Sequence, residues 1–569
     1  MCVESISHDV LVVGGGLAGL RAAIEIRREG RDVAILSKVH PLRSHSVAAQ
    51  GGINAALANA NVPVKDTWER HAFDTIKGAD YLADQDAAEL MCRDAIERVI
   101  EMEHWGTLFS RTEQGKIAQR PFGGAGFPRT CYAADRTGHN LLHVLYEQVT
   151  GLQIPVYEEW VALSLIVDEG RCIGLLALNF FEGKVVLFCS GAVVLATGGY
   201  GRIYLRSTNA IINTGSGCYL AYQAGVPLED MEFVQFHPTT LFGTNILMTE
   251  GARGEGGYLF NAEGERFIKR YVPHLMELGP RDIVARAIQT EIDEGRAFEG
   301  GYVHLDLRHL GEEKIMDVLP GIRQIARDFA GVDPVTQPIP IQPAQHYSMG
   351  GIPTNLDGET PLPGLFAAGE CACVSVHGAN RLGGNSLLDT LVFGARAGKK
   401  ASQTAGLENA PSRKALLQDG WNMFQSHLEE IFSRHGDQAC FQVRDEMKSL
   451  MTSHAGIFRK EPDLLVARDT IRQLKERFKQ ITVRQRGLAF NYELIQYLEL
   501  EAMLHVAEVI VAGALARNES RGSHYRVDYP ARDDEHWLRH TLAFYTPDGP
   551  RLEYKDVTIT NYPPKERTY

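Results

Sequence analysis

The sequence predicts an α/β fold that opens with a Rossmann-like domain, a type of domain that binds dinucleotides. Three observations lead to this prediction. A strand, a glycine-rich turn and a helix follow one another over residues 9–30, a second buried strand runs into glycines at 192–200, and amphipathic helical patterns fill residues 412–516. Strands that alternate with helical patterns favour a parallel sheet covered by helices.

The glycine turn near the N-terminus has the spacing of a phosphate-binding motif. Gly14 permits the tight turn, Gly16 lets backbone N–H groups approach a pyrophosphate, and Gly19 lets the helix pack close to its strand. A purely structural turn is the alternative, but the strand before it and the helix after it favour a binding site. The predicted dinucleotide contacts are Gly14, Gly15, Gly16, Leu17, Ala18 and Gly19.

The second strand argues against a plain NAD site. An acidic residue that binds the ribose of NAD is expected about twenty residues after the glycine turn. The strand over residues 33–36 ends instead in Ser37 and Lys38.

Composition excludes several classes of protein. The chain has 569 residues, enough for several domains, and its net charge of −13 argues against an extended nucleic-acid interface. Nine cysteines without any C-x-x-C pair predict a reducing compartment and no iron–sulfur or zinc site, so we expect no metal. We also expect no signal or transit peptide and no membrane-spanning segment.

The pattern of residues divides the chain into domains. Polar and charged turns cluster between residues 232 and 345, and the apolar, sheet-like pattern resumes at 365–370, so the region between is interpreted as an insertion. A helical pattern is expected over 66–106. The predicted divisions are a dinucleotide-binding domain in two parts (1–231 and 346–404), the inserted domain (232–345), a helical domain (405–516) and a C-terminal domain (517–569).

Six further motifs occur along the chain. They are residues 43–53 (RSHSVAAQGGI), 235–239 (QFHPT), 247–257 (LMTEGARGEGG), 279–286 (GPRDIVAR), 346–352 (HYSMGGI) and 377–389 (HGANRLGGNSLLD). In this order they resemble the flavoprotein subunit of succinate dehydrogenase and fumarate reductase, and the resemblance extends over essentially the whole chain. Six ordered motifs are far more specific than any one of them.

This resemblance implies a cofactor and a fold. The fold would be an FAD-binding domain interrupted by an α+β capping domain, followed by the helical and small C-terminal domains. His45 matches the histidine joined covalently to the 8α-methyl of FAD, where an electron-withdrawing imidazole raises the flavin potential; without the motif, a histidine in such a loop is more often simply hydrogen-bonded. The other implied FAD contacts are Ser37, Lys38, Ser44, Ser46, Gln50, Gly51, Gly52, Glu370, Ser386 and Leu387.

One position departs from the family pattern. Where many members read N-T-G-D-G, this chain reads N-T-G-S-G over residues 213–217, so Ser216 replaces an acidic FAD contact. A hydroxyl can still donate or accept a hydrogen bond, and Ser216 remains a candidate cofactor contact.

The resemblance also implies a dicarboxylate substrate. A dicarboxylate placed over a flavin needs cationic and hydrogen-bonding groups at both ends, and an arginine fork suits a carboxylate. Singly, each candidate has an ordinary alternative: a buried histidine bonded to backbone, a helix-capping threonine, an arginine in an ion pair. The residues that match the family's substrate contacts are His237, Thr249, His346 and Arg381.

Arg281 matches the arginine that carries a proton to or from the substrate. Because the pKa of arginine exceeds about 12, it can do so only if neighbouring groups relay the proton. Glu250 and Arg253 supply that relay by resemblance.

Electrons must then leave the flavin through other proteins. The chain has no cluster ligands, since Cys371 and Cys373 form only a C-x-C that we expect to be packed core. The resemblance therefore implies an iron–sulfur subunit docked near the loop of His45, and through it a membrane anchor with quinone. The expected location is the cytoplasmic face of the cell membrane, with attachment through these partners.

Several alternatives remain. Fumarate reductase performs the reverse reaction; Gln50 favours the dehydrogenase, but the direction stays open. L-aspartate oxidase shares the fold but lacks the histidine at position 45. A pyridine-nucleotide disulfide reductase would need a second glycine motif and a C-x-x-x-x-C, and a non-catalytic flavin scaffold would have no reason to carry Arg281, Glu250 and Arg381 together.

Overall fold

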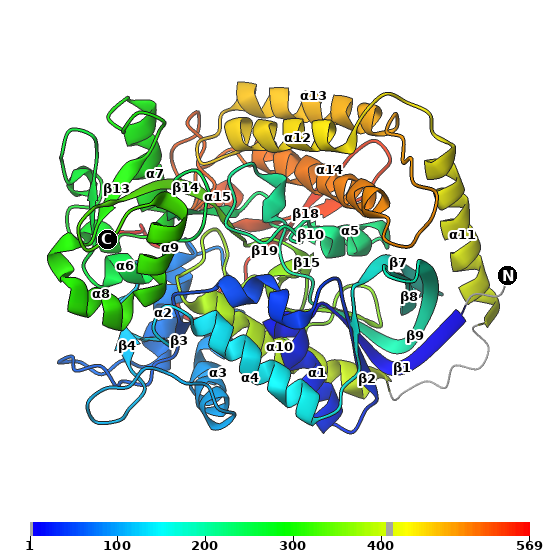
Figure 1. Cartoon of the computed structure of the whole chain (residues 1–569), viewed down its shortest axis with the longest axis horizontal. Coiled ribbons are helices and arrows are strands. Elements are labelled where there is room, and N and C mark those ends of the chain that lie inside the picture. Colours follow the sequence, from blue (N-terminus) through cyan, green and yellow to red (C-terminus); the bar gives the residue numbers. More distant parts are fainter. Residues whose placement is uncertain (1–3, 406–413, 569) are drawn as a thin grey trace.

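The computed structural model describes residues 4–405 and 414–568, without the side chains of 414–419 (Figure 1). Its central sheet is mostly parallel, as predicted, with two antiparallel strands at one edge. In sheet order the strands are β6 (Val156–Glu158), β2 (Val33–Ser37), β1 (Glu4–Val13), β9 (Lys184–Leu195), β8 (Arg171–Asn179) and β7 (Trp160–Asp168), and β16 (Leu365–Ala367) pairs with β9.

Alternation along β1 explains why both faces of the sheet are covered. Val10 and Val12 pack into one apolar core, and Leu11 and Val13 pack into another on the opposite face. The first core is shared with helices of the dinucleotide-binding region, and Figure 1 shows these helices together beside the strands. They are α1 (Leu17–Arg28), α3 (Gln85–His104), α4 (Thr137–Gly151) and α10 (Asn385–Ala405).

The helical pattern over 66–106 forms two helices. The chain forms α2 (Trp68–Gly78) and then α3, separated by a tight turn. Asp80 and Tyr81 have φ of 55° and 60° in that turn, a left-handed conformation that stops a helix.

The inserted region builds its own sheet and core, visible in green at the left of Figure 1. Strand β14 continues to Ser348, so the predicted boundary at residue 345 falls inside a strand; the division into domains stays a prediction. The sheet order is β11 (Val234–Leu241), β14 (Ile339–Ser348), β13 (Val303–Asp306) and β12 (Tyr258–Phe260), with helices α6 (Glu250–Gly254), α7 (Arg281–Asp293), α8 (Glu312–Val318) and α9 (Pro320–Ala330).

Helices follow the FAD-binding region, as the amphipathic pattern predicted. They are α11 (Lys414–Ser433), α12 (Cys440–His454), α13 (Glu461–Phe478) and α14 (Tyr492–Ala516), which ends where the helical pattern over 412–516 was expected to end. The predicted start of this domain at residue 405 adjoins residues 406–413, which lie outside the described residues. Among the described helices, none combines the length and the apolarity needed to cross a membrane.

The C-terminal region returns to the body of the protein. Strand β18 (Arg539–Phe544) pairs with β10 (Leu228–Glu229) and with β19 (Arg551–Asp556), after the short helix α15 (Asp534–Trp537).

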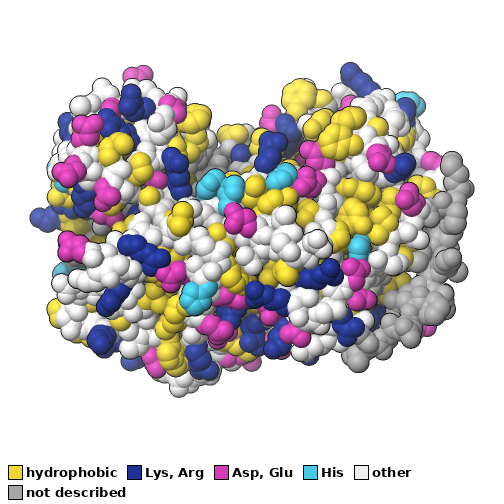
Figure 2. Space-filling view, turned by 60° about the horizontal axis from the view of Figure 1, so that its bottom comes forward, with side chains coloured by type: hydrophobic (Ala, Val, Ile, Leu, Met, Phe, Trp, Pro, Cys, Tyr) yellow, Lys and Arg dark blue, Asp and Glu magenta, His cyan; other side chains and the backbone are white. Residues whose placement is uncertain are grey.

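Figure 2 shows basic and acidic side chains interspersed over one face of the molecule. The remaining short elements are β3 (Ile53–Asn54), β4 (Gln119–Arg120), β5 (Thr130–Cys131), α5 (Ser216–Gln223), β15 (Ile352–Pro353) and β17 (Ala372–Cys373).

A buried charge network joins β18 to the body of the protein. The imidazole of His540 lies 2.7 Å from an oxygen of Asp230 and 3.3 Å from one of Asp84, and it is fully buried. Burial alone would lower the pKa of His540, but the surrounding carboxylates raise it to about 10. Glu229, Asp230 and His540 are also the described residues whose ligand atoms lie close enough to hold a metal ion, yet Lys555, 3.3 Å from Glu229, already supplies compensating charge.

We predict that His540→Gln destabilises the protein in a pH-dependent way. The folded pKa lies above the unfolded value of about 6.5, so the stabilisation is complete below that pH and is lost as pH rises through about 10. Breaking a buried pair costs about 3–5 kcal/mol, and thermal unfolding should show the variant's deficit to be larger at pH 6 than near pH 10.

The exposed His536, which pairs with Asp533 at 2.9 Å, supplies the control. His536→Gln should cost no more than about 1 kcal/mol. A deficit for His540→Gln that is the same at both pH values would contradict the assigned charge state.

Candidate active site

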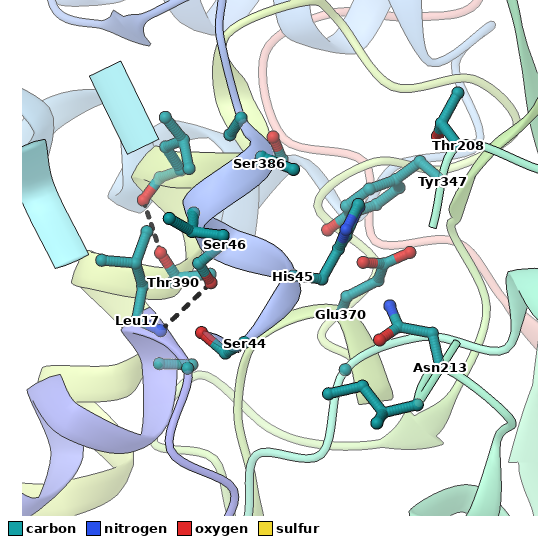
Figure 3. Close-up of a pocket in the computed structure, with 18 of the residues that line it drawn as sticks. Leu17, Ser44, His45, Ser46, Thr208, Asn213, Tyr347, Glu370, Ser386 and Thr390 are labelled. Carbon is teal, nitrogen blue, oxygen red and sulfur yellow. Dashed lines mark hydrogen bonds between the residues drawn. The ribbon is translucent and has the colours of Figure 1, made fainter. Parts of the chain in front are cut away.

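A cavity of about 740 Å³ lies where the glycine turn after β1 meets the inserted region. The loop over residues 44–52, strand β11 and the start of α7 also line it, and Figure 3 shows part of its wall. Of the residues predicted for the site, all except Gly19 and Arg253 line this cavity. Residues far apart in sequence, from Gly14 to Leu387, therefore meet at one place.

The glycine turn is built for close approach. Gly14 has a φ of +117°, and a Cβ at Gly19 would lie 1.9 Å from the carbonyl oxygen of Gly14. Helix α1 therefore starts directly on the turn, with its N-terminus toward the cavity. No side chain caps this end by the usual bond; the N–H of Leu17 donates to the Ser46 hydroxyl at 3.3 Å. Such an N-terminus suits the pyrophosphate of a dinucleotide.

The polar atoms of the cavity wall fit an FAD molecule. The hydroxyl oxygen of Ser44 and the amide oxygen of Gln50 are buried without a protein partner, and both residues line the cavity. Unpaired buried polar atoms are costly, and the hydroxyl and ring groups of FAD would supply partners. Ser386 and Leu387 lie in the first turn of α10, so a second helix N-terminus borders the same space.

His45 opens a single short 3-10 turn and points toward the side of the cavity where Glu370 and Tyr347 lie (Figure 3). Its Nδ1 accepts a hydrogen bond from the backbone N–H of Ala210 at 3.2 Å. Desolvation, with a smaller effect from Arg202, lowers the pKa of His45 to about 4, so the ring is neutral at physiological pH. A neutral, oriented imidazole is the form that can act as a nucleophile.

Other predicted cofactor contacts have protein partners as well. Lys38 forms an ion pair with Glu499 of α14. Ser216 begins α5, and its hydroxyl lies 2.8 Å from that of Thr214. Glu370 accepts a hydrogen bond from the N–H of Ser348 at 3.0 Å, and burial raises its pKa to about 7.

A buried ion-pair chain stands at the start of two helices of the inserted region. Arg281, the first residue of α7, donates from Nε to Glu250 at 2.6 Å, and Glu250 lies 3.7 Å from Arg253. Burial would raise the pKa of Glu250, but the two guanidinium groups outweigh it and hold the pKa below its usual value. Glu250 therefore stays ionised between two arginines, the arrangement that a proton relay requires.

Two histidines share this part of the cavity. The rings of His237 and His346 lie 4.9 Å apart, and the hydroxyl of Thr208 is 2.9 Å from Nδ1 of His346. Burial, reinforced by nearby positive charge, lowers the pKa of both histidines well below the usual value. Both rings are neutral and can donate hydrogen bonds to a carboxylate.

Thr249 and Arg381 complete the predicted set. The Thr249 hydroxyl accepts a hydrogen bond from the N–H of Gly251 at 3.2 Å, so it caps α6 and lines the cavity at once. The guanidinium of Arg381 lies 4.2 Å from the centre of the Tyr347 ring. Burial and the charge of Arg281 lower the pKa of Arg381 to about 9.

Sequence reasoning missed three side chains that shape the site: Gln235, Thr208 and Tyr347. Gln235 and Tyr347 stand inside the QFHPT and HYSMGGI motifs, directly beside residues that were identified. The motifs therefore contained the signal, but hydrogen-bonding roles for these residues emerge only from their contacts. Thr208 belongs to no recognised motif, so no sequence signal pointed to it.

The fold and this site together define a dinucleotide-binding oxidoreductase whose cavity is lined by cationic groups. The family model of the FAD binding domain matches residues 9–387, and that of the fumarate reductase flavoprotein C-terminus matches 444–569.

Relatives that carry a name are similar to this chain over almost its whole length. The chain is 46% identical to a succinate dehydrogenase flavoprotein subunit of Rickettsia bellii, covering 99% of this chain and 98% of that one. It is also 46% identical to a fumarate reductase flavoprotein subunit of Mycobacterium tuberculosis, covering 99% of each. The solved E. coli quinol fumarate reductase chain superposes with a TM-score of 0.96 at 42% identity, over 100% of this chain and 99% of that one. The chain belongs to the family of succinate dehydrogenase and fumarate reductase flavoprotein subunits.

We predict that Gly19→Ala strongly reduces FAD binding, because the added Cβ would meet the Gly14 carbonyl oxygen at 1.9 Å and push α1 off the turn. In the His45→Ser background, where no covalent bond to residue 45 can hold the flavin, FAD affinity measured by flavin absorbance during titration should fall about tenfold or more, which corresponds to about 1.4 kcal/mol. Gly151→Ala, at the end of α4 with open space around it, should bind FAD normally. Equal flavin content in both variants would contradict the assigned role of the turn.

Proposed function

We propose that this chain oxidises succinate to fumarate as the flavoprotein subunit of a quinone-linked succinate dehydrogenase. The observation that carries the proposal is that buried arginines and two neutral histidines, His237 buried and His346 half-buried, line the same cavity as the dinucleotide-binding turn. The names of the relatives support this chemistry in either direction.

The substrate's carboxylates would be held by groups whose charge states suit them. Arg381 offers a guanidinium fork, and His237 and His346 offer neutral N–H groups. Thr249 places its hydroxyl at the N-terminus of α6, which also favours an anion. These contacts polarise the carboxylate and stabilise the carbanion-like character that develops at the neighbouring carbon.

Proton transfer is assigned to Arg281. FAD, when bound, supplies the hydride acceptor. Arg281 exchanges a proton with the substrate. Because Arg281 Nε is hydrogen-bonded to Glu250 at 2.6 Å, the ionised carboxylate of Glu250 can compensate the charge of the guanidinium during the transfer. Arg253, on the other side of Glu250, is the next member of the relay, and its hydrogen bond to the backbone carbonyl of Glu277 holds it in place.

We expect Arg281→Gln to abolish turnover while retaining dicarboxylate binding. A glutamine removes the proton carrier but leaves Arg381 and both histidines in place. The rate constant kcat for succinate-dependent reduction of an artificial electron acceptor should fall by about 10²–10⁴-fold. Binding of malonate, followed by the flavin absorbance change, should weaken far less.

Arg286→Gln is the matched control, since Arg286 lies one turn further along α7 and pairs with Asp282 at 3.1 Å. It should retain succinate oxidation. Near-normal turnover in Arg281→Gln would overturn the shuttle assignment.

We also propose that FAD is attached covalently at His45, through the 8α-methyl. The neutral ring and the backbone hydrogen bond to Nδ1 support this, because they orient an imidazole within the cofactor cavity. After acid precipitation and washing, flavin fluorescence should stay with the wild-type polypeptide and leave with His45→Ser. Flavin that washes out of wild-type protein prepared with its partner subunits would favour the alternative function of an L-aspartate oxidase.

The proposed partners are an iron–sulfur subunit near the loop of His45 and, through it, a membrane anchor that exchanges electrons with quinone. The family and the solved quinol fumarate reductase relative support this arrangement. The proposed location is the cytoplasmic face of the membrane, where the chain would attach through these partners. Fumarate reduction is the second candidate, favoured by the relative from Mycobacterium tuberculosis that carries that name.

A further inference from the structure

The amide of Gln235 connects the two arginines of the site. Its Oε1 accepts hydrogen bonds from Arg281 at 3.1 Å and from Arg381 at 3.2 Å. Its Nε2 donates to the side-chain oxygen of Asn380 at 2.9 Å and to the backbone carbonyl of Arg381 at 2.8 Å. The side chain is fully buried, so all four bonds are made to protein groups and the amide is fixed in one orientation.

The charge of this connecting group matters as much as its geometry. Two guanidinium groups held around one acceptor repel each other, and a carboxylate at this position would relieve the repulsion. A carboxylate would also cancel one positive charge of the site. The neutral amide orients both guanidinium groups without cancelling either charge, and the Tyr347 ring, 4.2 Å from Arg381, fixes the other side of that arginine.

The site therefore keeps an excess of positive charge. Arg253 and Arg281 pair with the ionised carboxylate of Glu250, and Arg381, which is joined to Arg281 through Gln235, adds a third positive charge. Glu370 adds at most one more negative charge, and both histidines are neutral. A buried site with surplus positive charge favours a ligand with two carboxylates over a ligand with one.

We propose that Gln235 is a positioning residue that orients Arg281 and Arg381 and that, because its amide is uncharged, it preserves the positive charge by which the site selects dianionic over monoanionic carboxylates. This inference rests on the proposed function, because it concerns the substrate of the same cavity.

The test compares two probes, malonate as the dianion and propionate as the monoanion. Their dissociation constants are measured on the assembled holoenzyme by the change in flavin absorbance. In Gln235→Glu, the added negative charge should weaken malonate binding about tenfold and propionate binding about threefold, because the repulsion scales with the charge of the ligand, so the selectivity ratio falls about threefold.

A second variant separates orientation from charge. Gln235→Leu removes the hydrogen bonds but adds no charge, so the selectivity ratio should persist while kcat falls more than the malonate dissociation constant rises. Gln342→Glu is the matched control: Gln342 is a buried glutamine of β14 that donates to Asn245 at 2.8 Å, outside the cavity wall. It should leave the ratio and the turnover unchanged.

The outcomes distinguish this inference from the function on which it rests. A wild-type enzyme that neither binds malonate nor oxidises succinate overturns the proposed function. A wild-type enzyme that does both, with an unchanged ratio in Gln235→Glu or with the same loss in Gln342→Glu, overturns the role of Gln235 alone. If Gln235→Glu does not fold, Gln235→Leu provides the test. Loss of the selectivity for malonate over propionate in that variant would also overturn the role of Gln235.

Discussion

The burial of three neighbouring guanidinium groups, those of Arg281 and Arg381 in the cavity wall and that of Arg253 behind Glu250, is the constraint on which the site depends. Removing such charges from water is expensive unless partners compensate them. Here the compensation comes from Glu250, 2.6 Å from Arg281, and from the aromatic face of Tyr347 under Arg381. Glu250 opens α6 and Arg281 opens α7, so the first turns of two helices of the inserted region place this ion pair at the cavity.

The central sheet places the other half of the site. In doubly wound sheets, ligands bind beyond the carboxyl ends of the strands, where the connections leave in opposite directions. Strands β1 and β9 both end at this cavity, and Gly14 approaches the end of β9 so closely that a Cβ would lie 2.1 Å from the Ala196 carbonyl oxygen. The cofactor turn and the substrate pocket are therefore held by separate cores that meet over one space.

Local patterns predicted much of this arrangement. The glycine turn, α1 and α14 were predicted because strand, turn and helix periodicities are local properties. The break between α2 and α3 was missed because Asp80 and Tyr81 adopt left-handed φ values that ordinary side chains do not signal. Gln235 was missed since its role lies in hydrogen bonds to residues 46 and 146 positions away, on a strand whose pairing shifts register directly after it.

The sequence by itself determined the dinucleotide-binding turn, the alternation of strands and helices, and the motif residues that mark the family. These follow from short-range patterns and from residue types that the chemistry requires. Only the tertiary structure decided the charge states and contacts within the site: that His237 and His346 are neutral, that Glu250 stays ionised between two arginines, and that an amide joins Arg281 to Arg381. The physical reason is that burial and electrostatic coupling depend on distances between groups far apart in the chain.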